Sequence, residues 1–160
     1  MAKGIFQSEI LIIIVLAFIL ATTITLSHKI LTELRPYLNQ TTTGANVTQN
    51  TFNAISSLDF GAVLIVFGFG IGMVIMSFMV RSHPIFFIPG IILLIIAVLI
   101  SPQISNAFEY YATSEEISSS VVNFVLIQTM MSNLPLIVTI IGLIFMIVMY
   151  SKSINNKIGE

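Results

Sequence analysis

Long apolar runs alternate with polar segments along this chain. Four of the runs are long enough to cross a bilayer, over about residues 10–27, 60–80, 84–101 and 134–150. A transmembrane helix needs about 20 mostly apolar residues, and no run has an Asp, Glu, Lys, Arg or His in its interior. The pattern therefore predicts an all-α integral membrane protein with four transmembrane helices.

The connections between these runs differ in length and polarity. The second and third runs are separated only by the sequence R-S-H-P, which is Arg81, Ser82, His83 and Pro84. So short a link forces an antiparallel hairpin, with Pro84 at the first helical position, where its missing N–H has no cost. The connection over 29–59 is rich in Asn and Thr, and we expect it to form a polar outer loop.

The connection over 105–133 contains an acidic stretch and a second candidate helix. Thr113 and Glu116 have the spacing of a capping box, which marks a helix N-terminus. A helix starting there would place three apolar side chains on one face. These are Ile117, Val121 and Phe124. We therefore expect an interfacial helix before the fourth span.

Composition supports the membrane assignment and removes several classes of chemistry. Only 8% of the residues are charged, whereas soluble domains carry roughly 25%. The net charge of −1 provides no basic patch for nucleic acid. Because the chain has no cysteine, it forms no disulfide, thiolate nucleophile or Cys-ligated metal centre.

The basic residues near the span ends predict the orientation in the membrane. Four of them fall on the side of the two termini, and two, Lys29 and Arg35, fall on the opposite side. The four are Lys3, Arg81, Lys152 and Lys157. Since cytoplasmic loops carry an excess of Lys and Arg, both termini are predicted to be cytoplasmic.

The second run contains the glycine cluster G-F-G-I-G. A dinucleotide-binding loop has the spacing G-x-G-x-x-G after a strand, with an acidic residue farther on, and the cluster meets none of these conditions. Gly61, Gly68 and Gly72 instead share one helical face, and the last two form a GxxxG pair that lets a second backbone approach closely. We expect this face to pack within the chain or, as the alternative, laterally against a neighbouring subunit. Gly70 points away and has no assigned role.

Two prolines lie in the third run. Pro89 is expected to kink the helix, and Pro102 to bend it again near its exit. Broken helices can frame substrate sites in transporters. No buried charge is expected near either proline, so ordinary kinks are the favoured interpretation.

The remaining polar candidates indicate no cofactor. His28 and His83 are predicted to lie on opposite sides of the membrane, so they cannot form an axial pair for haem or a metal. Asn39 and Asn46 begin glycosylation sequons in the 29–59 connection. No nucleophile with a base, metal cluster or acid–base pair is evident. We therefore expect a non-enzymatic protein with no cofactor, metal, nucleic acid or small-molecule substrate.

Four features carry a resemblance to a known group of proteins. They are the span that begins at Asp59, the turn R-S-H-P-I-F-F, the exit S-x-x-x-S-N-A-F-E from Ser101 to Glu109, and the N-L-P sequence before the last span. Over about residues 56–150, the chain resembles small multi-span membrane proteins of tailless icosahedral phages and archaeal viruses that have an internal membrane. The resemblance implies a multicopy virion membrane component that packs laterally and contacts a capsid shell.

Two other classes of protein fit the same pattern. An accessory subunit of a cellular membrane complex would also lack its own chemistry and would show small-residue packing faces. A homo-oligomeric pore is the third alternative. In all three, the expected partners are the lipid bilayer, copies of the chain and other membrane or capsid proteins.

Overall fold

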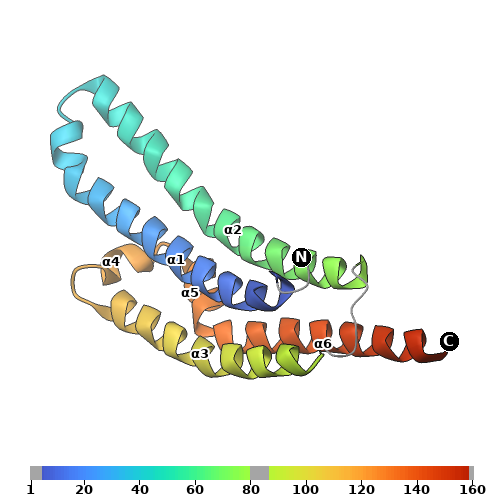
Figure 1. The fold of residues 1–160 in the computed structure, drawn as a ribbon. Helices are drawn as coiled ribbons and strands as arrows, with labels where there is room; N and C mark the ends of the chain where they lie inside the picture. Colours follow the sequence, from blue (N-terminus) through green and yellow to red (C-terminus); the bar gives the residue numbers. More distant parts are fainter. Residues whose placement is uncertain (1–4, 80–86, 159–160) are drawn as a thin grey trace.

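The computed structural model describes residues 5–79 and 87–158, and every regular element in these ranges is an α-helix. The helices are α1 (Ile5–Leu38), α2 (Thr42–Met79), α3 (Phe87–Thr113), α4 (Ser118–Val121), α5 (Val125–Ser132) and α6 (Leu134–Ile158). Helices α1 and α2 form one antiparallel pair, and α3 and α6 form another (Figure 1). The short helices α4 and α5 lie between the pairs, toward the end of the bundle away from the termini.

Three helices, α1, α2 and α3, are long and apolar enough to cross a membrane. The number rises to four if α5 and α6, which meet at an angle of 64°, together make one broken span. Large apolar side chains also face outward, as for Ile19 (52% exposed), Ile92 (54%) and Ile147 (67%). Such surfaces are stable in lipid rather than in water. The predicted all-α, multi-pass membrane class is confirmed, while the turn at Arg81, Ser82, His83 and Pro84 lies outside the described residues.

The prediction of an outer loop over 29–59 is wrong, because nearly all of this segment is helical. Helix α1 continues to Leu38, and α2 begins at Thr42, so the connection is a tight turn. The Thr41 hydroxyl caps α2 by accepting a hydrogen bond from the Gly44 N–H (3.0 Å). A Cβ on Gly44 would collide with the Leu38 carbonyl, so this turn requires glycine. The polar composition marks the end of the apolar run but does not end the helices.

The paired helices extend well beyond a bilayer core. At 1.5 Å per residue, the 34 residues of α1 and 38 residues of α2 measure about 51 and 57 Å, against roughly 30 Å of hydrocarbon. Figure 1 shows their tip projecting past the rest of the bundle. Asn39 lies in the turn at this tip, and Asn46 is exposed on the first turns of α2.

The segment 105–133 also differs from the prediction. Thr113 is the last residue of α3, and its hydroxyl donates to the Glu109 and Tyr110 carbonyls rather than capping a new helix. Two short helices follow, instead of one amphipathic helix lying along the surface. The residues expected on one face are indeed all buried, but they face the other helices of the bundle. Ile117 is 7% exposed, Val121 3% and Phe124 0%.

The prolines of α3 behave differently from each other. Pro89 lies in the first described turn of α3, where helical N–H groups have no intrahelical acceptor. Pro102 lies inside the helix, 11 residues before its end at Thr113, and leaves the Val98 carbonyl without its usual donor. The hydroxyl of the buried Ser101 donates to that carbonyl (3.3 Å). The helix then continues to Thr113.

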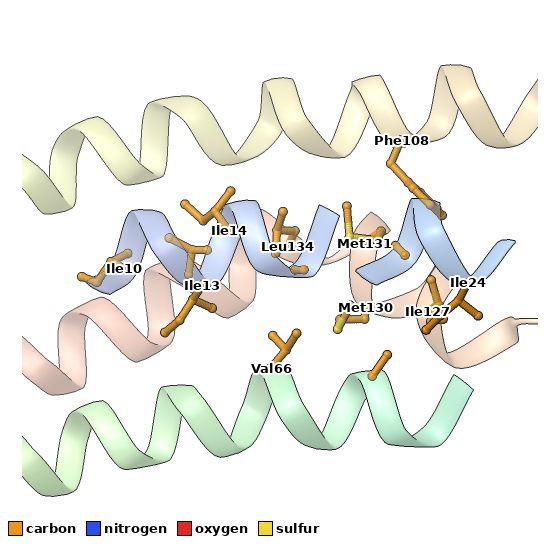
Figure 2. Close-up of a cluster of buried hydrophobic side chains, with 14 of the residues drawn as sticks. Ile10, Ile13, Ile14, Ile24, Val66, Phe108, Ile127, Met130, Met131 and Leu134 are labelled. Atoms are coloured by element: carbon orange, nitrogen blue, oxygen red, sulfur yellow. The ribbon is translucent and has the colours of Figure 1, made fainter. Parts of the chain in front are cut away.

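The hydrophobic core lies in the middle of the bundle, where α1 packs against α5. One face of α1 supplies Ile10, Ile13, Ile14 and Ile24, and α2 supplies Val66 from the other side (Figure 2). Helix α5 and the start of α6 contribute Ile127, Met130, Met131 and Leu134, all at most 3% exposed. A helix of eight residues thus contributes much of the centre of the protein.

Candidate functional site

The glycines fall into two sets with opposite surroundings. A Cβ on Gly61, Gly68 or Gly72 would meet no atom within 4 Å. A Cβ on Gly70 would lie 2.6 Å from Ile141 Cδ1 on α6, and one on Gly142 would overlap Leu94 Cδ1 on α3. The expectation that the first set packs within the chain is therefore wrong. Gly70, which had no assigned role, makes the close intramolecular approach.

The open glycine face forms part of a groove between α1 and α2. The groove has a volume of about 600 Å³ and is lined almost entirely by apolar side chains, together with Gly68 and Gly72. Glu9 lies at its edge, near the start of α1. We call this feature the glycine groove. It provides a space in a membrane-facing surface that another helix can enter.

The N-terminal end of α5 is held by a side chain from α2. Both carboxylate oxygens of Asp59 accept backbone hydrogen bonds: Oδ1 from the Ile127 N–H (2.8 Å) and Oδ2 from the Leu126 N–H (3.1 Å). The first N–H groups of any helix have no intrahelical acceptor and are expensive to bury unpaired. Asp59 therefore acts as an N-cap from a distant part of the chain.

The other end of α5 is held by α3. Pro135 has no N–H, so the Met131 carbonyl lacks the donor that would continue α5 directly into α6. The Ser105 hydroxyl donates to this carbonyl at 2.8 Å. Protein groups thus satisfy the backbone at both ends of this short helix, with α2 holding one end and α3 the other.

Replacement of Ser105 by alanine should weaken the junction between α5 and α6. We expect a loss of about 1 kcal/mol in the free energy of unfolding in detergent, which is typical of one hydrogen bond within a membrane protein. The matched control is Ser132→Ala, at an exposed position beside the junction. Isotope-edited infrared spectroscopy of the Met131 carbonyl checks the mechanism. An unshifted carbonyl band in Ser105→Ala would contradict this assignment.

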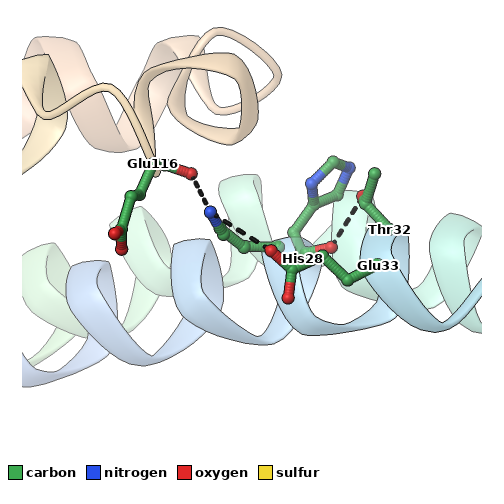
Figure 3. Close-up of polar contacts among 5 residues, drawn as sticks. His28, Thr32, Glu33 and Glu116 are labelled. Atoms are coloured by element: carbon green, nitrogen blue, oxygen red, sulfur yellow. Dashed lines mark hydrogen bonds and ion pairs between the residues drawn. The ribbon is translucent and has the colours of Figure 1, made fainter.

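Polar contacts also fasten α1 to the segment after α3. The Lys29 ammonium donates to the Glu116 carbonyl and pairs with the Glu33 carboxylate at 3.3 Å (Figure 3). His28 lies one residue earlier on α1 and is only 9% exposed. Its imidazole and the Thr32 side chain lie on the same side of the helix.

Sequence reasoning did not identify Asp59 or Ser105 as holding α5. The sequence places Asp59 at the edge of an apolar run, and this position indicated only where a span begins. No set of three or more His, Cys, Asp or Glu side chains that could hold a metal ion occurs within residues 5–79 and 87–158. The comparisons with protein-family models, curated proteins and solved structures returned no match to this chain.

Proposed function

We propose that this chain is a structural, non-enzymatic membrane protein that packs side by side with copies of itself. The observation that supports this most directly is the glycine groove. Gly68 and Gly72 leave an open space on the surface of a helix that otherwise carries large apolar side chains. In lipid, helices associate by close van der Waals contact, for which such spaces are suited.

A row of exposed apolar side chains on α6, which we call the ridge, has a shape that suits this groove. Leu136, Ile140, Leu143 and Ile147 follow one another along a single face of α6 and are 49–67% exposed. The spacing i, i+4, i+7, i+11 places them in one row. Within the chain, Gly70 and Gly142 already receive single aliphatic side chains from facing helices. The ridge of one copy entering the groove of the next repeats the same packing between molecules.

A contact between two different surfaces has a consequence for assembly. Such head-to-tail contacts generate rings or open arrays, rather than closed dimers. The resemblance to virion membrane proteins points to an array of many copies. The α1–α2 tip, which projects past the bundle and carries Thr and Asn side chains, is the part we propose to contact a capsid shell.

Replacement of Gly68 by leucine should disrupt lateral assembly and leave membrane insertion intact. The new side chain enters the groove, and its Cβ meets no atom of the chain's own fold within 4 Å. We expect the oligomer population in mild detergent, measured by light scattering after chromatography, to fall at least about tenfold, as a loss of about 1.4 kcal/mol per contact implies. Ala107→Leu, at an exposed site on α3 outside the groove, is the matched control. An unchanged oligomer size in Gly68→Leu would count against self-association through the groove.

A density gradient of the native source material tests the virion assignment separately. Migration with nuclease-protected nucleic acid and a dominant capsid protein is the expected result. Migration with cellular membranes and a cofactor-bearing complex would identify the chain instead as an accessory subunit, and would overturn the virion assignment.

A further inference from the structure

A second cavity, separate from the glycine groove, lies beside His28. It has a volume of about 410 Å³ and is bounded by α1, α2 and the segment around α4. Phe52 is the single apolar residue among the ten that line it. In a chain that is 56% hydrophobic, this concentration of hydrogen-bonding side chains in one cavity indicates a polar ligand.

The charge of the cavity favours an anion. Arg35 is its only lining residue that is charged at neutral pH, and no carboxylate lines it. The Arg35 guanidinium lies over the ring of Phe52, 5.3 Å from the centroid, and among the described residues it forms no ion pair. The contact with Phe52 holds the guanidinium at the cavity, and its N–H groups suit a bidentate acceptor such as phosphate.

His28 has an unmet hydrogen-bonding capacity next to this cavity. Its ring is held edge-on between Phe52 and Phe124, with centroid distances of 5.1 and 5.2 Å. The imidazole is nine-tenths buried, and its Nδ1 has no hydrogen-bond partner within the described residues. Buried polar groups are nearly always paired, so an unpaired one beside a polar cavity points to a missing ligand.

The position of the cavity relative to the membrane indicates which molecule supplies the anion. Its residues on α1 and α2 come directly after one apolar run and directly before the next. Tyr111 on α3 is hydrogen-bonded to Thr25, one turn from His28, and Tyr110 beside it is 84% exposed. Tyrosines gather at the level of lipid headgroups. The cavity therefore lies where phospholipid phosphates are concentrated.

We infer that this cavity binds the headgroup phosphate of an anionic phospholipid. Arg35 supplies the charge, and the side chains of Asn53, Ser120 and Asn123 line the same space as further donors. A zwitterionic headgroup is disfavoured because its ammonium group would find no carboxylate in the cavity. Basic pockets between membrane helices recognise anionic headgroups in this way.

The test uses the purified full-length chain in detergent with equal amounts of phosphatidylglycerol and phosphatidylcholine. Native mass spectrometry is expected to show about tenfold preferential retention of phosphatidylglycerol, as one charge-assisted contact implies. Arg35→Gln should abolish the preference. Lys152→Gln, which removes one positive charge from the end of α6 that lies away from α4, should retain it. His28→Phe keeps the ring packing, removes both nitrogens and should reduce the preference.

Three results would overturn the inference. They are equal retention of the two lipids by the unaltered chain, a full preference in Arg35→Gln, and displacement of phosphatidylglycerol by excess inorganic phosphate. The last would show a site for a soluble anion, because lipid tails should otherwise hold the headgroup in place. Circular dichroism of each variant establishes that a lost preference does not reflect a lost fold.

Discussion

Replacement of Asp59 by alanine is expected to release α5 from the bundle. The change removes both carboxylate oxygens that accept the Leu126 and Ile127 N–H groups, and leaves the partly buried Ile127 donor and the exposed Leu126 donor without these acceptors. Hydrogen bonds to a charged group contribute about 1.5–3 kcal/mol each, so we expect the free energy of unfolding to fall by about 3 kcal/mol.

Hydrogen exchange monitored by mass spectrometry locates this effect. Amides of α5 should lose protection in Asp59→Ala, while those of α3 keep theirs. Asp59→Asn retains one acceptor oxygen and should show an intermediate loss. Glu109→Ala removes an equal charge from an exposed position and should leave exchange in α5 unchanged. Full protection of α5 in Asp59→Ala would show that side-chain packing alone holds this helix.

Replacement of Gly142 by leucine should disturb the contact between α6 and α3. Even a Cβ at this position would overlap Leu94 Cδ1 and lie 3.4 Å from its Cγ, so a whole leucine side chain must displace Leu94 from the contact. Inserting side chains into a packed interior costs about 1–3 kcal/mol, and we expect a value near the top of that range.

Gly68→Leu is the matched control for Gly142→Leu. Both variants add the same side chain to a glycine in a membrane helix. Gly142→Leu should unfold at lower denaturant concentration, whereas Gly68→Leu should keep its stability and lose assembly. Unfolding titrations in detergent measure the first property, and chromatography measures the second. Equal stability of the two variants would show that Leu94 moves aside readily.

Hydrophobic patterning predicted the parts of the fold that lipid determines. The described parts of the four apolar runs lie within α1, α2, α3 and α6, because a helix satisfies the backbone of a single segment in hydrocarbon. Patterning failed where the chain leaves the bilayer. Between the first two runs, Thr and Asn continue the helices instead of forming a loop, as when Thr48 packs in a buried position and bonds back to the Gly44 carbonyl.

The candidate sites were predictable only in part. Periodicity placed Gly61, Gly68 and Gly72 on one face, but which glycine face meets a neighbouring helix depends on the order of helices around the bundle. The capping of α5 by Asp59 joins residues 68 positions apart along the chain, and no local spacing reports such a pair. The same holds for Ser105, whose role appears only beside the Met131 carbonyl.

The dependence of α5 on Asp59 and Ser105 sets an order of events during biosynthesis. With eight residues, α5 is too short to cross the bilayer alone, and its exposed ends would be costly in hydrocarbon. It can settle only after α2 and α3 have been synthesised, inserted and brought together. Helices α1, α2 and α3 therefore form a binding site for α5, which is synthesised after them and completes the bundle. A truncated chain ending after α3 should remain open and become a substrate for membrane quality control.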